Sequence, residues 1–83
     1  MRKGQTDMPR NLLKEIEDSF SKFSKSQKII STYILENYDK AAYMTASKLA
    51  SAVSVSESTV VRFAIELGFD GYPEFQHALQ EIV

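Results

Sequence analysis

Cysteine and tryptophan are both absent from this 83-residue chain. Without cysteine the chain can form neither a disulfide nor a thiolate metal site, which is compatible with the reducing cytoplasm where we expect the protein to act. No apolar run approaches the roughly 18 residues that a membrane-spanning helix needs, so we expect no contact with a membrane. The first seven residues carry charges without an apolar segment after them, and we therefore expect no secretory signal peptide.

Glycine and proline are scarce, with three and two copies, and no segment alternates apolar and polar residues as a half-buried strand does. Apolar residues instead recur at the spacings of amphipathic helices, and serine or threonine precedes several of these segments as a possible cap. The predicted fold is therefore all-α, a compact bundle of about five helices that contains a helix-turn-helix of the homeodomain-like kind. The expected helices are residues 10–21, a second from Ser24 or Ser26 to about Asn37 with a helical turn from Asp39 to Met44, then 46–53, 57–67 and a last one that starts at Pro73.

Histidine occurs once, which limits the catalytic options. His77 lies beside the apolar stripe of the last helix, and a surface or boundary position explains it better than a role as general base or ligand. No second histidine and no cysteine could complete a metal site around it. We therefore expect no enzymatic activity, no metal and no cofactor.

The formal net charge is −1, although proteins that bind nucleic acids usually present a basic surface. The charges are unevenly distributed, because Lys22, Lys25 and Lys28 follow one another without an acidic residue between them. A total near zero can therefore conceal a basic face, although it does not require one.

The most informative segment runs from Thr45 to Gly68 and predicts a helix, a tight link and a second helix. Thr45 and Ser56 can cap the two helices, and the short link Ser54–Val55 forces a steep crossing. Ala50 is small enough to let the two helices approach closely. This arrangement is typical of a helix-turn-helix unit.

The second helix of this unit, residues 57–67, separates into two faces when its residues are placed 100° apart. Ser58 and Arg62 lie on the outer face, where they could contact base edges or a phosphate in a major groove roughly 12 Å wide. Val61 and Ile65 flank them, and they could instead mark a protein interface. Binding of DNA and a protein–protein or dimerisation module therefore remain alternatives at this point. The residues expected to face the core are Val60, Phe63, Ala64 and Leu67.

Two motifs give the sequence a family resemblance: "SVSESTVVRF", which starts at Ser54, and "LGFDGYPEF", which starts at Leu67. The segment "SQKIISTYILEN" supports them. Together, over about residues 12–83, they resemble the N-terminal helix-turn-helix domain of the RpiR family of bacterial transcription regulators.

The resemblance implies a sequence-specific DNA-binding domain over residues 10–83, preceded by a flexible lead at residues 1–9. It also implies a regulator of sugar or sugar-phosphate metabolism that binds a double-stranded operator as a homodimer. In that family a C-terminal sugar-isomerase-like domain senses a phosphorylated sugar, and this chain does not include such a domain. Within the dimer, we expect the apolar stripe of the first helix to pack across the two-fold axis; its residues are Leu12, Leu13, Ile16 and Phe20.

Seven positions of this sequence fall where the family meets DNA, and the resemblance implies the same role for them here. Ser47 and Lys48 would contact backbone phosphates, and the others would belong to the recognition helix. This chain departs from the family where basic residues are frequent, with Ala64, Ile65 and Glu66 after Arg62–Phe63 and with Asp70 and Gln76 further on. It also has Ser54 where glycine is usual, so Ser54 is expected to adopt a positive φ. The expected recognition-helix contacts are Ser56, Glu57, Ser58, Thr59 and Arg62.

Overall fold

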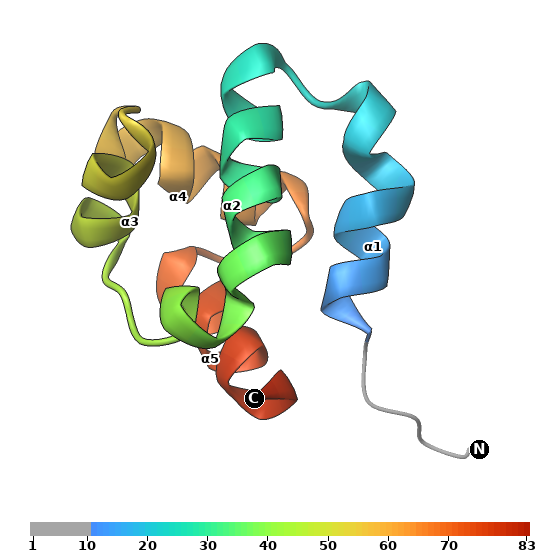
Figure 1. Cartoon of the computed structure of the whole chain (residues 1–83), viewed down its shortest axis with the longest axis vertical. Coiled ribbons are helices and arrows are strands. Elements are labelled where there is room, and N and C mark those ends of the chain that lie inside the picture. Colours follow the sequence, from blue (N-terminus) through green and yellow to red (C-terminus); the bar gives the residue numbers. More distant parts are fainter. Residues whose placement is uncertain (1–10) are drawn as a thin grey trace.

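A computed structural model describes residues 11–83, which form five α-helices and one 3-10 turn around a common core (Figure 1). This range contains no β-strand, and the prediction of an all-α fold is confirmed. The expected lead at residues 1–9 lies outside the described residues. The elements are α1 (Leu12–Ser19), the 3-10 turn η1 (Phe20–Lys22), α2 (Lys25–Ala41), α3 (Ala46–Val53), α4 (Glu57–Glu66) and α5 (Tyr72–Ile82).

The first helix packs its apolar stripe against its own chain. The Asn11 side chain accepts a hydrogen bond from the amide of Lys14 (3.1 Å) and so caps the start of α1. Leu12 and Ile16 are 1% and 0% exposed, because α1 packs along α2. The expectation that this stripe packs across a two-fold axis is therefore wrong for these two residues, which are already buried within one chain.

Helix α2 begins at the first of the two candidate caps. The Ser24 hydroxyl accepts from the Gln27 amide (3.3 Å), and the Gln27 side-chain oxygen accepts from the Ser24 amide (2.8 Å). This reciprocal pair is a capping box, which satisfies two amides that the first turn of a helix otherwise leaves unpaired.

Helix α2 extends to Ala41 but is interrupted at Asn37, where the sequence predicted that the helix ends and a further helical turn follows. Asn37 has a non-helical backbone (φ −138°, ψ 39°), and its side-chain amide donates to the carbonyl of Tyr33 (3.2 Å). An asparagine that bonds to nearby backbone competes with the helical ladder, which explains a kink at this position.

The inner face of α2 is narrow. Ile30 and Ile34 are fully buried, whereas Ile29 is 42% exposed. Adjacent isoleucines point about 100° apart on a helix, so both could not face the same neighbouring helices.

Aromatic rings occupy the centre of the core and connect α4 to the elements around it. The Phe63 ring packs edge-on against Phe23 (centroids 5.2 Å apart) and against Phe75 (6.0 Å). Phe69 also packs against Phe75, at 5.6 Å. Edge-to-face pairs at these distances are favourable beyond the area that they bury, so they hold α4 against α5 and against the end of η1.

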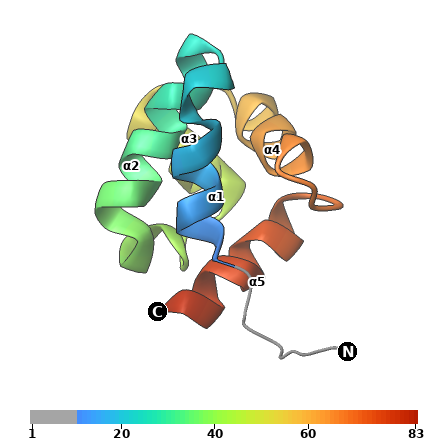
Figure 2. The same cartoon turned by 90° about the vertical axis from the view of Figure 1, so that its right-hand side faces the viewer.

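Helix α5 crosses beneath the other helices and holds the connection between α2 and α3 (Figures 1 and 2). The side-chain amides of Gln76 and Gln80 both donate to the carbonyl oxygen of Ala42, at 3.2 and 3.0 Å. The Tyr72 hydroxyl donates to the carbonyl oxygen of Met44 at 2.7 Å. These three bonds fix the point at which α3 starts.

Candidate nucleic-acid interface

Helices α3 and α4 are joined by a tight turn over residues 54–56. Ser54 has a left-handed backbone (φ 60°, ψ 43°), as the family resemblance implied. The amide of Val55 donates to the Ala50 carbonyl (3.0 Å) and that of Ser54 to the Ser51 carbonyl (3.4 Å), which are the two bonds of a Schellman motif. Ala50 is only 4% exposed, so its small side chain lets the two helices pack closely.

Both helices of the pair begin with a side-chain cap. The Thr45 hydroxyl accepts from the Lys48 amide (3.1 Å), and the Ser56 hydroxyl accepts from the Thr59 amide (3.2 Å). Ser56 Oγ also lies 2.7 Å from Thr59 Oγ1 and 3.2 Å from Ser58 Oγ. Three hydroxyls therefore form a hydrogen-bonded cluster at the start of α4, where the positive end of the helix dipole favours an anion.

The two faces of α4 have opposite character, as the sequence predicted. Ser58 and Arg62 are exposed on the outer face. On the inner face, three of four apolar residues are at most 1% exposed. The inner-face residues are Val60, Phe63, Ala64 and the half-buried Leu67.

The outer face of α4 carries a shallow hollow in which polar and apolar groups alternate. Ser58, Val61, Arg62 and Ile65 line it together with Glu57. Ile65 is 51% exposed, although it is a large aliphatic residue. The surface can therefore offer hydrogen bonds, a cation and aliphatic contacts to the same ligand.

A second hollow adjoins the first and includes residues that sequence reasoning did not assign to the site. Glu57 and Val61 border both hollows, and the start of α3 lines the second one. The start of α5 also lines it, with Tyr72, Pro73 and Gln76. The sequence showed the turn before α5 only as a helix start; its position next to α4 follows from the packing of Phe63 and Phe75.

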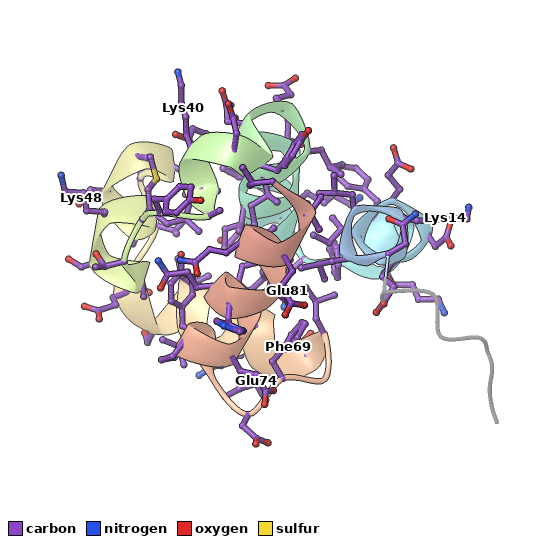
Figure 3. The ribbon with its side chains drawn as sticks, turned by 90° about the horizontal axis from the view of Figure 1, so that it is seen from below. Lys14, Lys40, Lys48, Phe69, Glu74 and Glu81 are labelled. Atoms are coloured by element: carbon purple, nitrogen blue, oxygen red, sulfur yellow. The ribbon has the colours of Figure 1, made fainter. Side chains whose placement is uncertain are left out.

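Positive charge on this surface is sparse. Lys48 projects from α3 on the side of the molecule away from Lys14, which belongs to α1 (Figure 3). Arg62 is the basic residue of α4, and the acidic Glu57 lies in the same hollow. The positive potential of this surface therefore comes from the side chains of Lys48 and Arg62 and from the backbone amides at the starts of α3 and α4.

The described residues contain neither a metal-binding cluster nor a membrane-spanning helix. Among residues 11–83, no three histidine, cysteine, aspartate or glutamate side chains gather as a metal site would require. His77 is exposed on α5, as the sequence suggested. Within the same range, none of the helices has the length and apolar character needed to cross a bilayer.

Comparison with known proteins identifies the family. The pattern described as "Helix-turn-helix domain, rpiR family" matches residues 10–83. The chain belongs to the rpiR family of helix-turn-helix domains.

Relatives that are named as transcriptional regulators support the rpiR assignment. The chain is 35% identical to the HTH-type transcriptional regulator HexR of Pseudomonas aeruginosa over 72 residues, which are 87% of this chain and 25% of HexR. It is 38% identical to the HTH-type transcriptional regulator GlvR of Bacillus subtilis over 61 residues, which are 74% of this chain and 24% of GlvR. The chain thus spans about a quarter of the length of the curated relatives that it matches.

The seven residues for which the rpiR resemblance implied a DNA contact all lie at the helix pair. Six of them are exposed, whereas Thr59 is half-buried and its hydroxyl contacts Ser56. Their contact with DNA stays a prediction. The six exposed residues are Ser47, Lys48, Ser56, Glu57, Ser58 and Arg62.

Proposed function

We propose that this rpiR-family domain binds double-stranded DNA sequence-specifically, with α4 in the major groove. The supporting observation is the orientation of α4, which buries Val60 and Phe63 and exposes Ser58 and Arg62. A helix of ten residues is about 15 Å long, and its width suits a major groove about 12 Å across. The outer face could then contact base edges while the inner face stays in the core.

The proposed contacts follow from the chemistry of each exposed group. Arg62 can donate two parallel hydrogen bonds to a guanine, or it can bind a phosphate. Ser58 can bond to a base edge, since a hydroxyl both donates and accepts. Lys48 and Ser47, at the start of α3, would bind backbone phosphates, and so would the amides capped by Ser56.

We further propose that the domain acts in a cytoplasmic transcription regulator of sugar or sugar-phosphate metabolism. The family resemblance supports this, together with the regulatory names of relatives more than three times as long as this chain. The regulator would bind as a homodimer to two half-sites about 34 Å apart and would sense a phosphorylated sugar through its sugar-isomerase-like domain.

Selection of bound duplexes from a random pool tests the proposed DNA binding and yields the operator. Duplex binding should weaken as salt rises, because bound phosphates release counterions. Replacing Arg62 with alanine should cost about 1–3 kcal/mol if its guanidinium contacts a base. The matched control is Lys14→Ala, which removes an exposed cation of α1 on the side of the molecule away from Lys48 and should leave binding nearly unchanged.

Two results would contradict the proposal in different ways. If no duplex is enriched at any salt concentration, the domain does not bind DNA specifically. If duplexes are enriched but Arg62→Ala binds as the unmodified protein does, α4 is not the recognition helix. Its outer face would then be available for protein contact, the alternative that the sequence left open for Val61 and Ile65.

A further inference from the structure

The exposed Ile65 on the outer face of α4 has no structural explanation within the domain. Its side chain is 51% exposed, so burial contributes little there. Valine and isoleucine also lose side-chain freedom in a helix, so neither Ile65 nor the half-buried Val61 is explained by helix propensity. An aliphatic surface in this position is available to a ligand with an apolar group.

Ile65 continues the stripe that begins with Ser58. Val61, Arg62 and Ile65 follow Ser58 by three, four and seven residues, so all four lie on one face of the helix. All four line the same shallow hollow. Any ligand that reaches Ser58 and Arg62 along this face therefore also meets Val61 and Ile65.

We propose that Ile65, with Val61 beside it, contacts the C5-methyl group of a thymine and makes the domain specific for that base. The inference rests on the proposed function, since it requires α4 to lie in the major groove. The edges of the four base pairs there present hydrogen-bonding groups and one apolar group, the thymine methyl. An exposed aliphatic side chain in the groove has that methyl as its complementary partner.

The position of the thymine relative to the other contacts follows from helix geometry. Seven residues of an α-helix span about 10 Å. Successive base pairs are about 3.4 Å apart, so Ile65 should meet a base about three pairs from the one that Ser58 meets. Contacts by Arg62 and by Ile65 are therefore separable in an operator.

A second copy of the chain could also bind to this stripe, but the area of the stripe is too small for a stable dimer interface. A helix face about 15 Å long and 10 Å wide offers about 150 Å², whereas a stable interface takes about 800 Å² from each partner.

Replacing thymine with uracil tests the contact, because the two bases differ only by the C5-methyl group. In the selected operator, each thymine is exchanged for uracil in turn, and the affinity of the protein is measured. We expect roughly fourfold weaker binding at one position of each half-site, as the loss of one buried methyl predicts. The Ile65→Ala protein should bind the thymine and uracil operators equally well.

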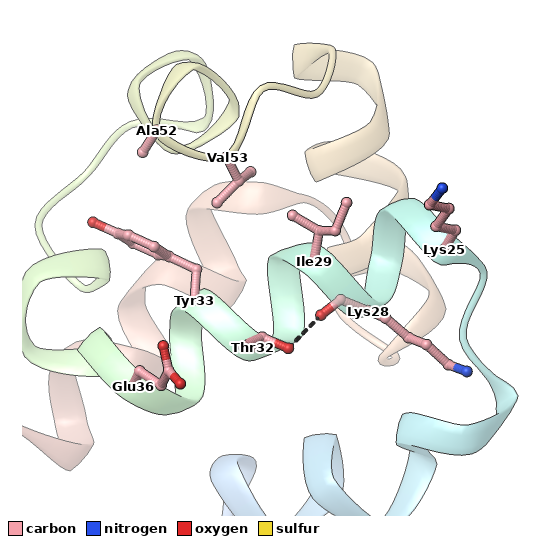
Figure 4. A pocket seen from close by; sticks show the side chains of 8 residues that line it. All are labelled: Lys25, Lys28, Ile29, Thr32, Tyr33, Glu36, Ala52 and Val53. Carbon is pink, nitrogen blue, oxygen red and sulfur yellow. Dashed lines mark hydrogen bonds between the residues drawn. The ribbon is translucent and has the colours of Figure 1, made fainter.

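The matched control is Ile29→Ala. Ile29 is an isoleucine of similar exposure, 42%, and it lies on α2 in a groove shared with Ala52 and Val53 of α3 (Figure 4). This variant should keep the full difference between thymine and uracil. Light scattering should give the same mass for Ile65→Ala as for the unmodified protein.

Each contrary result has its own meaning. A selected operator without a fixed thymine, an operator insensitive to uracil, or a uracil effect that persists in Ile65→Ala would overturn the methyl contact and leave the proposed function standing. A smaller mass for Ile65→Ala would assign the stripe to a second copy. Failure to select any duplex would overturn the methyl contact and DNA binding together.

Discussion

At the scale of single residues, the helix pair contains two left-handed positions that are filled differently. Ser54 (φ 60°) follows α3, and Gly68 (φ 100°) follows α4. Both belong to Schellman motifs, since Phe69 donates to the Ala64 carbonyl (3.2 Å) as Val55 does to that of Ala50. Glycine adopts this backbone without penalty, whereas a residue with a Cβ is strained there by about 1–2 kcal/mol.

Replacing Ser54 with glycine should therefore stabilise the domain. The relief of strain exceeds the cost of a more flexible unfolded chain, which is about 0.4–1 kcal/mol, so a gain of up to about 1 kcal/mol is expected. The midpoint of urea unfolding measures it. Ser51→Gly is the matched control, because Ser51 is exposed within α3 and glycine there should destabilise. If Ser54→Gly destabilises the domain as Ser51→Gly does, Ser54 is not strained.

At the scale of the helices, one side-chain amide joins the start of α2 to the end of α4. Gln27 is 8% exposed, and its oxygen is already used in the capping box of α2. Its nitrogen donates to Glu66 Oε1 at 2.9 Å, across 39 residues of sequence. The carboxylate of Glu66 lies at the negative end of the α4 dipole, a position that disfavours an anion. The hydrogen bond from Gln27 offsets that disadvantage.

Two substitutions at Glu66 separate these effects. Glu66→Gln keeps an oxygen for Gln27 and removes the charge, so stability should stay equal or rise slightly. Glu66→Ala leaves the buried amide of Gln27 without its partner and should cost about 1 kcal/mol. Thermal or urea unfolding of the two variants compares them directly. If alanine and glutamine give the same stability, the bond between α2 and α4 contributes nothing.

Local patterns in the sequence predicted the helix pair well because its determinants are local. The caps Thr45 and Ser56 and the two faces of α4 depend on residues within a turn or two of each other. The positive φ of Ser54 was implied by the glycine that is usual in the family at this position. The exposed position of Ile29 depends instead on which helices lie opposite α2. The bond between Gln27 and Glu66 and the place of the α5 start beside α4 likewise join distant segments, and periodicity carries no information about such pairs.

At the scale of the whole molecule, α5 holds the helix-turn-helix to the rest of the bundle. Its contacts to the α2–α3 connection come from Tyr72, Gln76 and Gln80, which bond to two backbone carbonyls. Those carbonyls belong to Ala42 and Met44, just before the cap of α3. The orientation of the proposed DNA-binding surface therefore depends on a helix that follows it in sequence.

The buried Tyr72 should make the stability of this arrangement sensitive to alkaline pH. Burial raises the pKa of the Tyr72 hydroxyl from 10.0 to about 12, since the anion would lose its hydration. The folded state therefore favours the protonated hydroxyl, and the resulting contribution to the free energy of unfolding is complete below pH 10. Above that, the unfolded chain releases the proton first, so stability should fall by up to about 2–3 kcal/mol between pH 10 and 12.

Replacing Tyr72 with phenylalanine tests this origin of the alkaline loss. The variant should lose about 1 kcal/mol at neutral pH, because the bond to the Met44 carbonyl is gone, yet its stability should decline less above pH 10. Tyr43→Phe is the matched control: Tyr43 is 67% exposed, so the alkaline decline should persist when it is replaced. Unfolding in urea at several pH values gives the slopes. If the unfolding free energies of Tyr72→Phe and Tyr43→Phe fall equally with pH, groups other than Tyr72 cause the alkaline decline. The proton in the hydrogen bond from Tyr72 to the Met44 carbonyl would then not account for the pH dependence of the contact between α5 and the α2–α3 connection.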